Sequence, residues 1–290
     1  MDQNLNSRSN SKTFAYTVLA LLAFAGNSLI CRMALKESTI EPALFTYIRL
    51  ISGALFLFLL VFVKKKSGKE KTKGSWISGA MLFIYAAAFS YAYISLDTGT
   101  GALILFGSVQ ITMIAFSLFS GHKMSPLEWI GVILALSGFL YLMLPGAKAP
   151  SLSGFLLMTI SGIGWGMYSI RGKNSKNPLH DTAYNFLKAT PFLLFILFLL
   201  VLETNLTSKG VLLALFSGVV TSGLGYVIWY AALKGLTHIQ ASVVQLFVPV
   251  LAGIGGFVFI QEIISFRLFV AAVLILGGIL LLIIKRHSTK

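Results

Sequence analysis

Two basic residues interrupt apolar stretches of the sequence, and each could bind an anionic group. Arg49 lies seven residues after Pro42, and Lys188 lies seven residues after Asp181, near the beginning of another apolar stretch. At 1.5 Å per helical residue, seven positions place each cation about 10 Å inside its helix. A cation at that depth in a membrane costs a few kcal/mol, so each residue marks a candidate functional site.

Both cations have an alternative role, in which the long side chain reaches the lipid headgroups from about two turns inside. For Lys188 the sequence leaves both roles open. For Arg49, which follows Thr46 and Tyr47, we favour an inward-facing role. A guanidinium offers five N–H donors in a planar fork, which suits a carboxylate or a phosphate.

Uncharged polar side chains at mid-stretch positions could line a cavity together with Arg49. Amide side chains within lipid need partners, and the alternative for each is a hydrogen bond between helices worth about 0.6–2 kcal/mol. Aromatic residues with polar tips also need a partner, which a hydrated cavity supplies. We therefore predict a substrate-binding set of Asn27, Arg49, Gln110, Trp165, Tyr168 and Gln245.

The chemistry of an enzyme is missing from the sequence. It contains no H-E-x-x-H zinc motif, no G-x-S-x-G nucleophile motif and no nucleotide-binding glycine loop. The four histidines fall between the apolar stretches or in the tail, without metal-ligand spacing. All nine acidic residues lie outside the apolar stretches or at their edges, so no buried carboxylate is available as an obvious proton carrier, which counts against proton antiport. We expect no catalytic residue, cofactor or metal site.

The composition places the chain in a lipid bilayer. Of its 290 residues 57% are hydrophobic and only 11% are charged, and its mean hydropathy is +0.86. Apolar stretches of about 20 residues can cross the membrane as helices, and the stretches lack the alternation of a membrane barrel. We predict an all-α multi-pass membrane protein with ten transmembrane helices, at 13–31, 43–63, 74–96, 98–121, 129–147, 149–170, 182–202, 210–233, 239–261 and 268–284.

The distribution of lysine and arginine predicts the orientation. If the amino terminus is cytoplasmic, sixteen basic residues lie on the cytoplasmic side, six of them between positions 64 and 73, and five lie outside. Short loops rich in lysine and arginine stay in the cytoplasm. We therefore expect a plasma (inner) membrane protein with both termini cytoplasmic. The net charge of +14 is explained by headgroup contact, without a nucleic-acid partner.

The segment from Leu144 to Gly154, with two prolines and two glycines, divides the chain into similar halves. At a shift of 139 to 140 positions, Arg32 aligns with Arg171, and Arg49 aligns with Lys188. We predict a tail at 1–12, five-helix repeats at 13–145 and 151–285, and a second tail at 286–290. Five is odd, so the second repeat enters the membrane from the opposite face. Such inverted repeats are widespread in secondary transporters, which bind substrate near the midplane.

Three local features add detail to the prediction. Pro249 lies within a span and predicts a kink there. Tyr91 and Tyr93 are expected near the outer interface and Tyr226 near the inner interface, where aromatic belts form.

Ten spans in two halves, Pro42 with Arg49, and a characteristic closing series resemble the EamA-type branch of the drug/metabolite transporter superfamily. That series is Ala241, Pro249, Glu262 and Gly278. The resemblance implies a ten-helix inverted repeat, a central cavity between the halves, and movement of small metabolites such as amino acids, often outward. The first half departs from the pattern, because His122 stands where Glu262 stands in the second half, and Gln110 stands opposite Pro249.

The leading hypothesis is a secondary carrier for a small metabolite, such as an amino acid or related zwitterion, whose partners are that substrate and the lipid bilayer. One alternative is a translocase for lipids or lipid-linked sugars, which would use a groove open to the membrane. Another is a membrane scaffold that transports nothing, which would have no polar cavity at the midplane.

Overall fold

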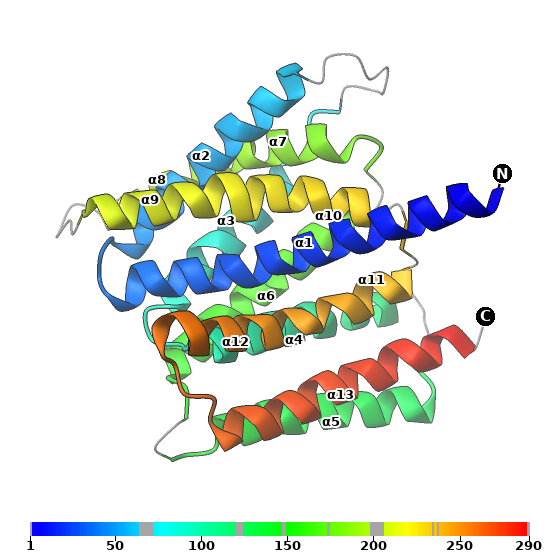
Figure 1. Cartoon of the computed structure of the whole chain (residues 1–290). Coiled ribbons are helices and arrows are strands. Elements are labelled where there is room, and N and C mark those ends of the chain that lie inside the picture. The colour runs from blue at the N-terminus through cyan, green and yellow to red at the C-terminus, as the bar shows by residue number, and fades with distance from the viewer. Residues whose placement is uncertain are drawn as a thin grey trace.

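The computed structural model is a bundle of helices that lie roughly side by side (Figure 1). It describes residues 2–63, 72–119, 124–146, 149–172, 175–197, 206–233, 235–236 and 238–288. Within these residues no strand is present. The lysine-rich segment 64–71 and His122 lie outside the described residues.

The helical elements follow one another closely along the chain. They are α1 (Asp2–Lys36), α2 (Pro42–Val63), α3 (Trp76–Ala92), α4 (Thr98–Phe119), α5 (Pro126–Met143), α6 (Leu152–Gly172), α7 (Pro178–Ala189), η1 (Thr190–Leu193), α8 (Leu194–Leu197), α9 (Ser208–Phe216), η3 (Ser217–Leu224), α10 (Gly225–Leu233), α11 (His238–Gln245), α12 (Phe247–Ile260) and α13 (Phe266–Ser288).

Six helical stretches of the described chain are long and apolar enough to cross a membrane, and two shorter apolar helices accompany them. These stretches confirm an all-helical, multi-pass membrane protein. The helix α6 lies outside both groups although it has 21 residues, because serines, glycines and a terminal arginine dilute its apolar character. The count of ten crossings therefore stays a prediction.

The two halves of the chain pack on each other with a matching pattern. The helix α1 packs against α10 and α12, and its counterpart α6 packs against α3 and α4. The helix α2 packs against its own counterpart α7, and α5 packs against its counterpart α13. Under the alignment of the halves, the contacts of α1 map onto those of α6, and the α2–α7 and α5–α13 contacts each map onto themselves. The bundle is therefore built as a two-fold arrangement of repeats.

The counterpart helices run in opposite directions. Arg32, near the end of α1, donates a hydrogen bond to the carbonyl of Tyr93 in the turn after α3. In the same turn, Ser95 is hydrogen-bonded to Ser151, immediately before α6 begins, at 2.7 Å. The end of α1 and the start of α6 thus share one end of the bundle. Both termini lie at the opposite end (Figure 1).

Two helical stretches of the second half are irregular. A break at Leu246 separates α11 from α12, three residues before Pro249, where the mid-span proline predicts a kink. Between α9 and α10, the segment η3 (Ser217–Leu224) is a π-helix. Such π-helical turns are rare and occur frequently at functional sites. The sequence analysis did not predict this one.

Adjacent glycines of α13 allow a matched test of helix packing. A Cβ atom at Gly278 would lie 2.5 Å from the backbone oxygen of Gly131 in α5, whereas one at Gly277 would meet nothing within 4 Å. We predict that Gly278→Ala destabilises the protein by about 1–3 kcal/mol, because the backbones of α5 and α13 must separate. Gly277→Ala should preserve or slightly raise stability. Thermal unfolding in detergent measures both, and equal melting temperatures would contradict the close contact.

Candidate functional site

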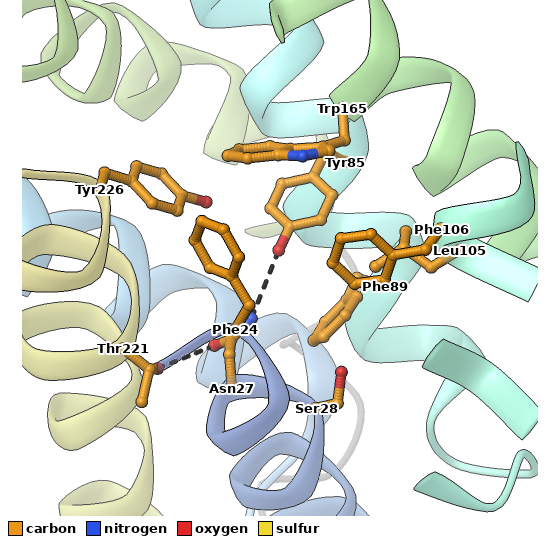
Figure 2. Close-up of a pocket in the computed structure, with 10 residues that line it drawn as sticks. All are labelled: Phe24, Asn27, Ser28, Tyr85, Phe89, Leu105, Phe106, Trp165, Thr221 and Tyr226. Atoms are coloured by element: carbon orange, nitrogen blue, oxygen red, sulfur yellow. Dashed lines mark hydrogen bonds between the residues drawn. The ribbon is translucent and has the colours of Figure 1, made fainter. Parts of the chain in front are cut away.

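A small cavity lies at the centre of the bundle, where helices of both repeats meet (Figure 2). Its volume of about 10 Å³ is close to the minimum that a single water molecule requires. The cavity is lined by Phe24, Asn27, Ser28, Tyr85, Phe89, Leu105, Phe106, Trp165, Thr221 and Tyr226. In this conformation the site is closed, and a metabolite would need the surrounding helices to separate.

Asn27 is the polar centre of the cavity. Its side-chain oxygen accepts hydrogen bonds from Ser217 Oγ at 2.7 Å and from Thr221 Oγ1 at 3.1 Å. Its Nδ2 donates to the hydroxyl of Tyr85 at 3.3 Å. Asn27 on α1 is thereby joined to α3 of its own repeat and to the π-helix of the other repeat.

The π-helix presents its hydroxyls toward the first repeat because its backbone approaches α2 closely. A Cβ atom at Gly218 would collide with the side chain of Ser52 and the backbone oxygen of Arg49. Only glycine therefore fits at this crossing. The close approach places Ser217 and Thr221 on Asn27, and it places Ser222 beside the guanidinium of Arg49.

The guanidinium of Arg49 is buried directly behind the cavity wall, with 1% of the residue exposed. Its Nε donates to Ser222 Oγ at 3.1 Å, and its Nη2 donates to the hydroxyl of Tyr85 at 3.0 Å. The rings of Tyr85 and Phe89 lie 5.2 and 5.1 Å from its central carbon, which are cation–π distances. Among the described residues, Nη1 has no hydrogen-bond partner, and no carboxylate pairs with this charge.

Aromatic rings form the remaining wall of the cavity. The ring of Trp165 lies 4.9 Å from the rings of both Tyr85 and Tyr226. Phe24 makes edge-to-face contacts with Trp165 at 6.3 Å and with Tyr226 at 6.1 Å. Electron-rich ring faces attract an ammonium group, most strongly where water is excluded. The cavity therefore combines ring faces with an incompletely bonded cation behind them.

The structure brings together only part of the predicted substrate-binding set. Asn27 and Trp165 line the cavity, and Arg49 contacts its wall through Tyr85. Tyr168 stacks on Trp165 with a centroid separation of 5.4 Å, one layer away from the cavity.

The two glutamines of the predicted set lie outside the cavity lining. Gln110 is buried in α4, where its Nε2 has no hydrogen-bond partner among the described residues. Gln245 donates to the carbonyl of Ala241 in its own helix at 3.2 Å. Their position in the middle of a span did not fix the direction in which each side chain points.

Sequence reasoning missed several residues of the site. Tyr226 was expected near the inner interface, but it is buried and packs against Trp165 in the cavity. Tyr93 was expected in an outer aromatic belt, but it is fully buried, and its hydroxyl donates to the carbonyl of Thr98. The spacing of Tyr85, Phe89 and Tyr93 at four-residue intervals was the available signal, because it places three rings on one face of a helix.

Lys188 lies away from the cavity, near the end of the bundle that holds the termini. Its Nζ donates to the carbonyl of Gly74 at 3.3 Å and lies 5.6 Å from the ring centre of Trp76. Half-buried and directed toward the loop before α3, it has the geometry of a snorkelling lysine. The aligned cations Arg49 and Lys188 thus occupy different environments.

Two carboxylates at the edges of apolar stretches are buried, so the expectation that no buried carboxylate is available was wrong. Glu262, just beyond the end of α12, is buried, and its Oε1 accepts a hydrogen bond from Arg32 Nε at 3.0 Å. Glu128 is also buried, where its side chain completes a capping box with Ser125 at the start of α5. Both residues lie at helix ends, where sequence position suggested solvent exposure, and neighbouring helices cover them.

Comparison with protein families finds two matches within the chain. Residues 11–144 and 152–284 each match the model of the EamA-like transporter family. A solved structure also has a similar fold, with a TM-score of 0.64 and 18% sequence identity over 94% of this chain and 99% of that one. The first finding concerns sequence and the second concerns the fold.

Individual relatives extend along nearly the whole chain. The protein PA1977 of Pseudomonas aeruginosa is 47% identical over 95% of this chain and 96% of its own length. The uncharacterized transporter YoaV of Bacillus subtilis is 28% identical over 83% of this chain and 86% of its own length. An uncharacterized transporter of Archaeoglobus fulgidus is 26% identical over 96% of this chain and its entire length.

Removal of one hydroxyl tests the polar centre of the site. Tyr85→Phe deletes the acceptor for Arg49 Nη2 and a partner of Asn27, and it leaves the ring in place. We predict a loss of about 1–3 kcal/mol in stability, because a buried charged donor loses its partner. Thermal unfolding in detergent measures the loss, with Tyr16→Phe on the exposed face of α1 as the control. Equal stability of the two variants would contradict a structural role for this hydroxyl.

Proposed function

The chain belongs to the EamA-like transporter family, and from this premise we propose that it is a secondary transporter of a small zwitterionic metabolite, such as an amino acid. It moves this substrate by alternating access, in which the two repeats rearrange around a central site. We further propose that it lies in the plasma (inner) membrane with both termini in the cytoplasm, and that it works in export. The lysine and arginine distribution supports this orientation, as does the common end of the two termini (Figure 1).

The observation that carries the proposed substrate class is the buried charge of Arg49. It has no carboxylate partner among the described residues, and its Nη1 makes no hydrogen bond. A substrate carboxylate could accept from this atom once the wall formed by Tyr85 and Phe89 opens. When the guanidinium pairs with a substrate carboxylate, it gains a charge-assisted hydrogen bond, which is about twice as strong as a neutral one.

The other end of a zwitterion fits the aromatic side of the cavity. The faces of Trp165, Tyr85 and Tyr226 surround the space into which an ammonium group would project. The oxygen of Asn27 accepts from Ser217 and Thr221. It becomes the adjacent polar acceptor for an ammonium group when Thr221 Oγ1 donates instead to the carbonyl of Ser217, 3.0 Å away. Opposite charges of a small zwitterion can therefore meet opposite surfaces of one site.

The enclosure of the site supports a carrier over a lipid translocase. Side chains from α1, α3, α4, α6 and the irregular stretch η3–α10 surround the cavity. A lipid headgroup would require a polar groove open to the acyl chains, whereas these polar groups face the interior. A polar centre at the seam of the repeats likewise counts against a scaffold without transport.

Counterflow in proteoliposomes tests the proposal. Vesicles loaded with an unlabelled amino acid should accumulate the same radiolabelled compound, and amino acids of each side-chain class serve as probes. We predict that Arg49→Ala lowers the initial rate at least about tenfold, since a hydrogen bond to a charged group contributes about 1.5–3 kcal/mol. Arg49→Lys should retain part of the rate, because it keeps the charge but loses the fork.

Lys188→Ala is the matched control, because it removes a partly buried cation from the end of the bundle. It should leave counterflow near the wild-type rate. Amino acid amides, which lack the carboxylate, should compete poorly in the wild type. Undiminished counterflow in Arg49→Ala would remove Arg49 from substrate binding, and absence of counterflow for every zwitterion would overturn the substrate class.

A further inference from the structure

One face of α1 leads from the central cavity to the end of the bundle opposite the termini. Phe24, Asn27 and Ser28 line the cavity, and Cys31 and Arg32 follow at the helical spacing that keeps them on the same side. Both Cys31 and Arg32 are buried. The same face therefore continues from the candidate binding site for another turn, to a charged residue.

A series of rings on α3 runs beside this face. Tyr85 and Phe89 line the cavity, with ring centres 5.5 Å apart, and Phe89 makes an edge-to-face contact with Tyr93 at 4.8 Å. The backbone oxygen of Tyr93 accepts a hydrogen bond from Arg32 at 2.9 Å. The helices α1 and α3 thus connect the same two places, the cavity and the surroundings of Arg32.

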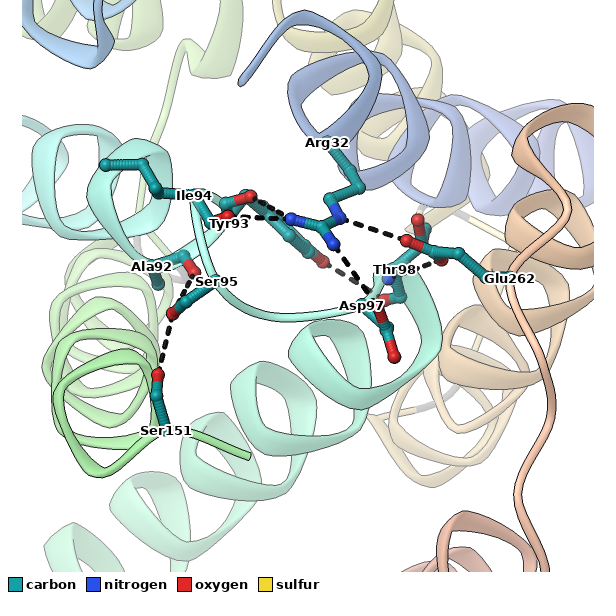
Figure 3. Close-up of polar contacts among 9 residues, drawn as sticks. All are labelled: Arg32, Ala92, Tyr93, Ile94, Ser95, Asp97, Thr98, Ser151 and Glu262. Carbon is teal, nitrogen blue, oxygen red and sulfur yellow. Dashed lines mark hydrogen bonds and ion pairs between the residues drawn. The ribbon is translucent and has the colours of Figure 1, made fainter. Parts of the chain in front are cut away.

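Arg32 closes this end of the bundle with four polar partners (Figure 3). Its Nη1 donates to the backbone oxygens of Tyr93 and Ile94 at 2.9 and 2.8 Å, and its Nη2 donates to Asp97 at 3.2 Å. Its Nε donates to Glu262 at 3.0 Å. The first three partners belong to the same repeat as Arg32, and Glu262 alone belongs to the other repeat.

Glu262 is the principal charged partner that joins the repeats here. Its second oxygen accepts from the backbone N–H of Thr98, at the start of α4, at 2.8 Å. Side-chain exposure is 7% for Glu262 and 55% for Asp97. Partial desolvation, together with the adjacent Glu262 carboxylate, raises the pKa of the half-exposed Asp97 above its usual value despite Arg32. Glu262 therefore forms the shorter and more deeply buried of the two ion pairs of Arg32.

The opposite end of the bundle has no equivalent ion pair among the described residues. Arg171, which aligns with Arg32, donates to the hydroxyls of Ser78 and Ser75 at 3.4 and 3.3 Å. These are long contacts with neutral acceptors, and both serines belong to the first repeat. Within the part of the chain that the structure describes, a buried ion pair between the repeats is therefore found at the end that contains Arg32.

We propose that Arg32 and Glu262 form a gate on the substrate pathway, and that the pathway from the cavity to this gate follows the α1 face that carries Ser28 and Cys31. The proposal rests on the proposed carrier function. Separation of the pair would free α1 and α3 of one repeat from the end of α12 of the other. The cavity would then open toward the side that the lysine distribution assigns to the exterior.

Cys31, the single cysteine of the chain, reports directly on this opening. Fully buried between the gate and the cavity, its thiol should react slowly with N-ethylmaleimide in the detergent-purified protein. In Glu262→Gln the rate should rise at least about tenfold, because the buried Arg32 then keeps only the half-exposed Asp97 as a charged partner and loses its ion pair with the other repeat, which favours the open state.

Glu37→Gln is the matched control at the same end. Glu37 pairs with Lys209 of the other repeat, but both side chains are about half exposed. Because exposed pairs contribute little, its labelling rate should stay within about twofold of the wild type. Cys31→Ser gives the background of the assay.

A second variant leaves every charge in place. A Cβ atom at Gly256 would collide with Oε2 of Glu262 and lie 3.0 Å from Cβ of Thr98, so Gly256→Ala should displace the carboxylate and also accelerate labelling. Gly255→Ala is its control, since a Cβ there meets only Leu29 at 3.4 Å. Comparison of Gly256→Ala with Gly255→Ala separates opening of the gate from a direct electrostatic effect of Glu262 on the thiol. If Glu262→Gln does not fold, this comparison alone tests whether the gate opens.

Labelling of Cys31 that is no faster in folded Glu262→Gln and Gly256→Ala than in their controls would overturn the gate. The assay requires no substrate, so its result is independent of counterflow. Accelerated labelling combined with no zwitterion counterflow in the wild type would support the gate and overturn the proposed substrate class. Slow labelling in both variants, with zwitterion counterflow in the wild type, would overturn the gate and support the proposed substrate class.

Discussion

The buried charge of Arg49 is the constraint on which the centre of the structure depends. In a bundle surrounded by lipid, a cation keeps its charge only where neighbouring groups replace its hydration. Here the hydroxyls of Ser222 and Tyr85 and two aromatic faces provide that replacement. The same Tyr85 hydroxyl also accepts from Asn27. The residues that line the cavity, Tyr85 above all, are therefore also the residues that stabilise the charge of Arg49.

This arrangement in turn requires a particular backbone at the crossing of α2 and η3. Glycine at position 218 allows the carbonyl of Arg49 to approach the other repeat without a side chain between them. The π-helical turn then directs Ser217 and Ser222 toward different partners on two helices of the first repeat. A regular α-helix repeats every 3.6 residues, and a local change of pitch alters which side chains share a face. The π-helical turn thus determines which serine contacts Asn27 and which contacts Arg49.

The sequence predicts the class of fold well because composition and segment length respond directly to the bilayer. The similar halves could also be recognised, since Arg32 and Arg171 lie at equivalent helix ends. Side-chain direction was less accessible: Gln110 and Asn27 look alike in the sequence, yet only Asn27 lines the cavity. Tyr226 and Glu262 were placed at interfaces because they lie near segment ends. Their burial depends on helices from elsewhere in the chain, which local patterns do not specify.

The packing also indicates which parts of the bundle can move. At the α5–α13 contact, Gly138 and Gly278 bring backbones together, so separation would expose an extended complementary surface. Around the cavity, α1 contacts the other repeat through rings and hydroxyls, such as Phe24 on Trp165 and Ser217 on Asn27. By contrast, α6 packs closely on the backbones of α4 and α3 at Gly162 and Gly164. Rings can slide and hydroxyls can exchange one acceptor for another, at a smaller cost than parting close-packed backbones. We therefore infer that α5 and α13 form a static support and that α6 stays packed on α3 and α4, while α1, which carries Phe24, Asn27 and Ser28 of the cavity, changes its neighbours as the site opens.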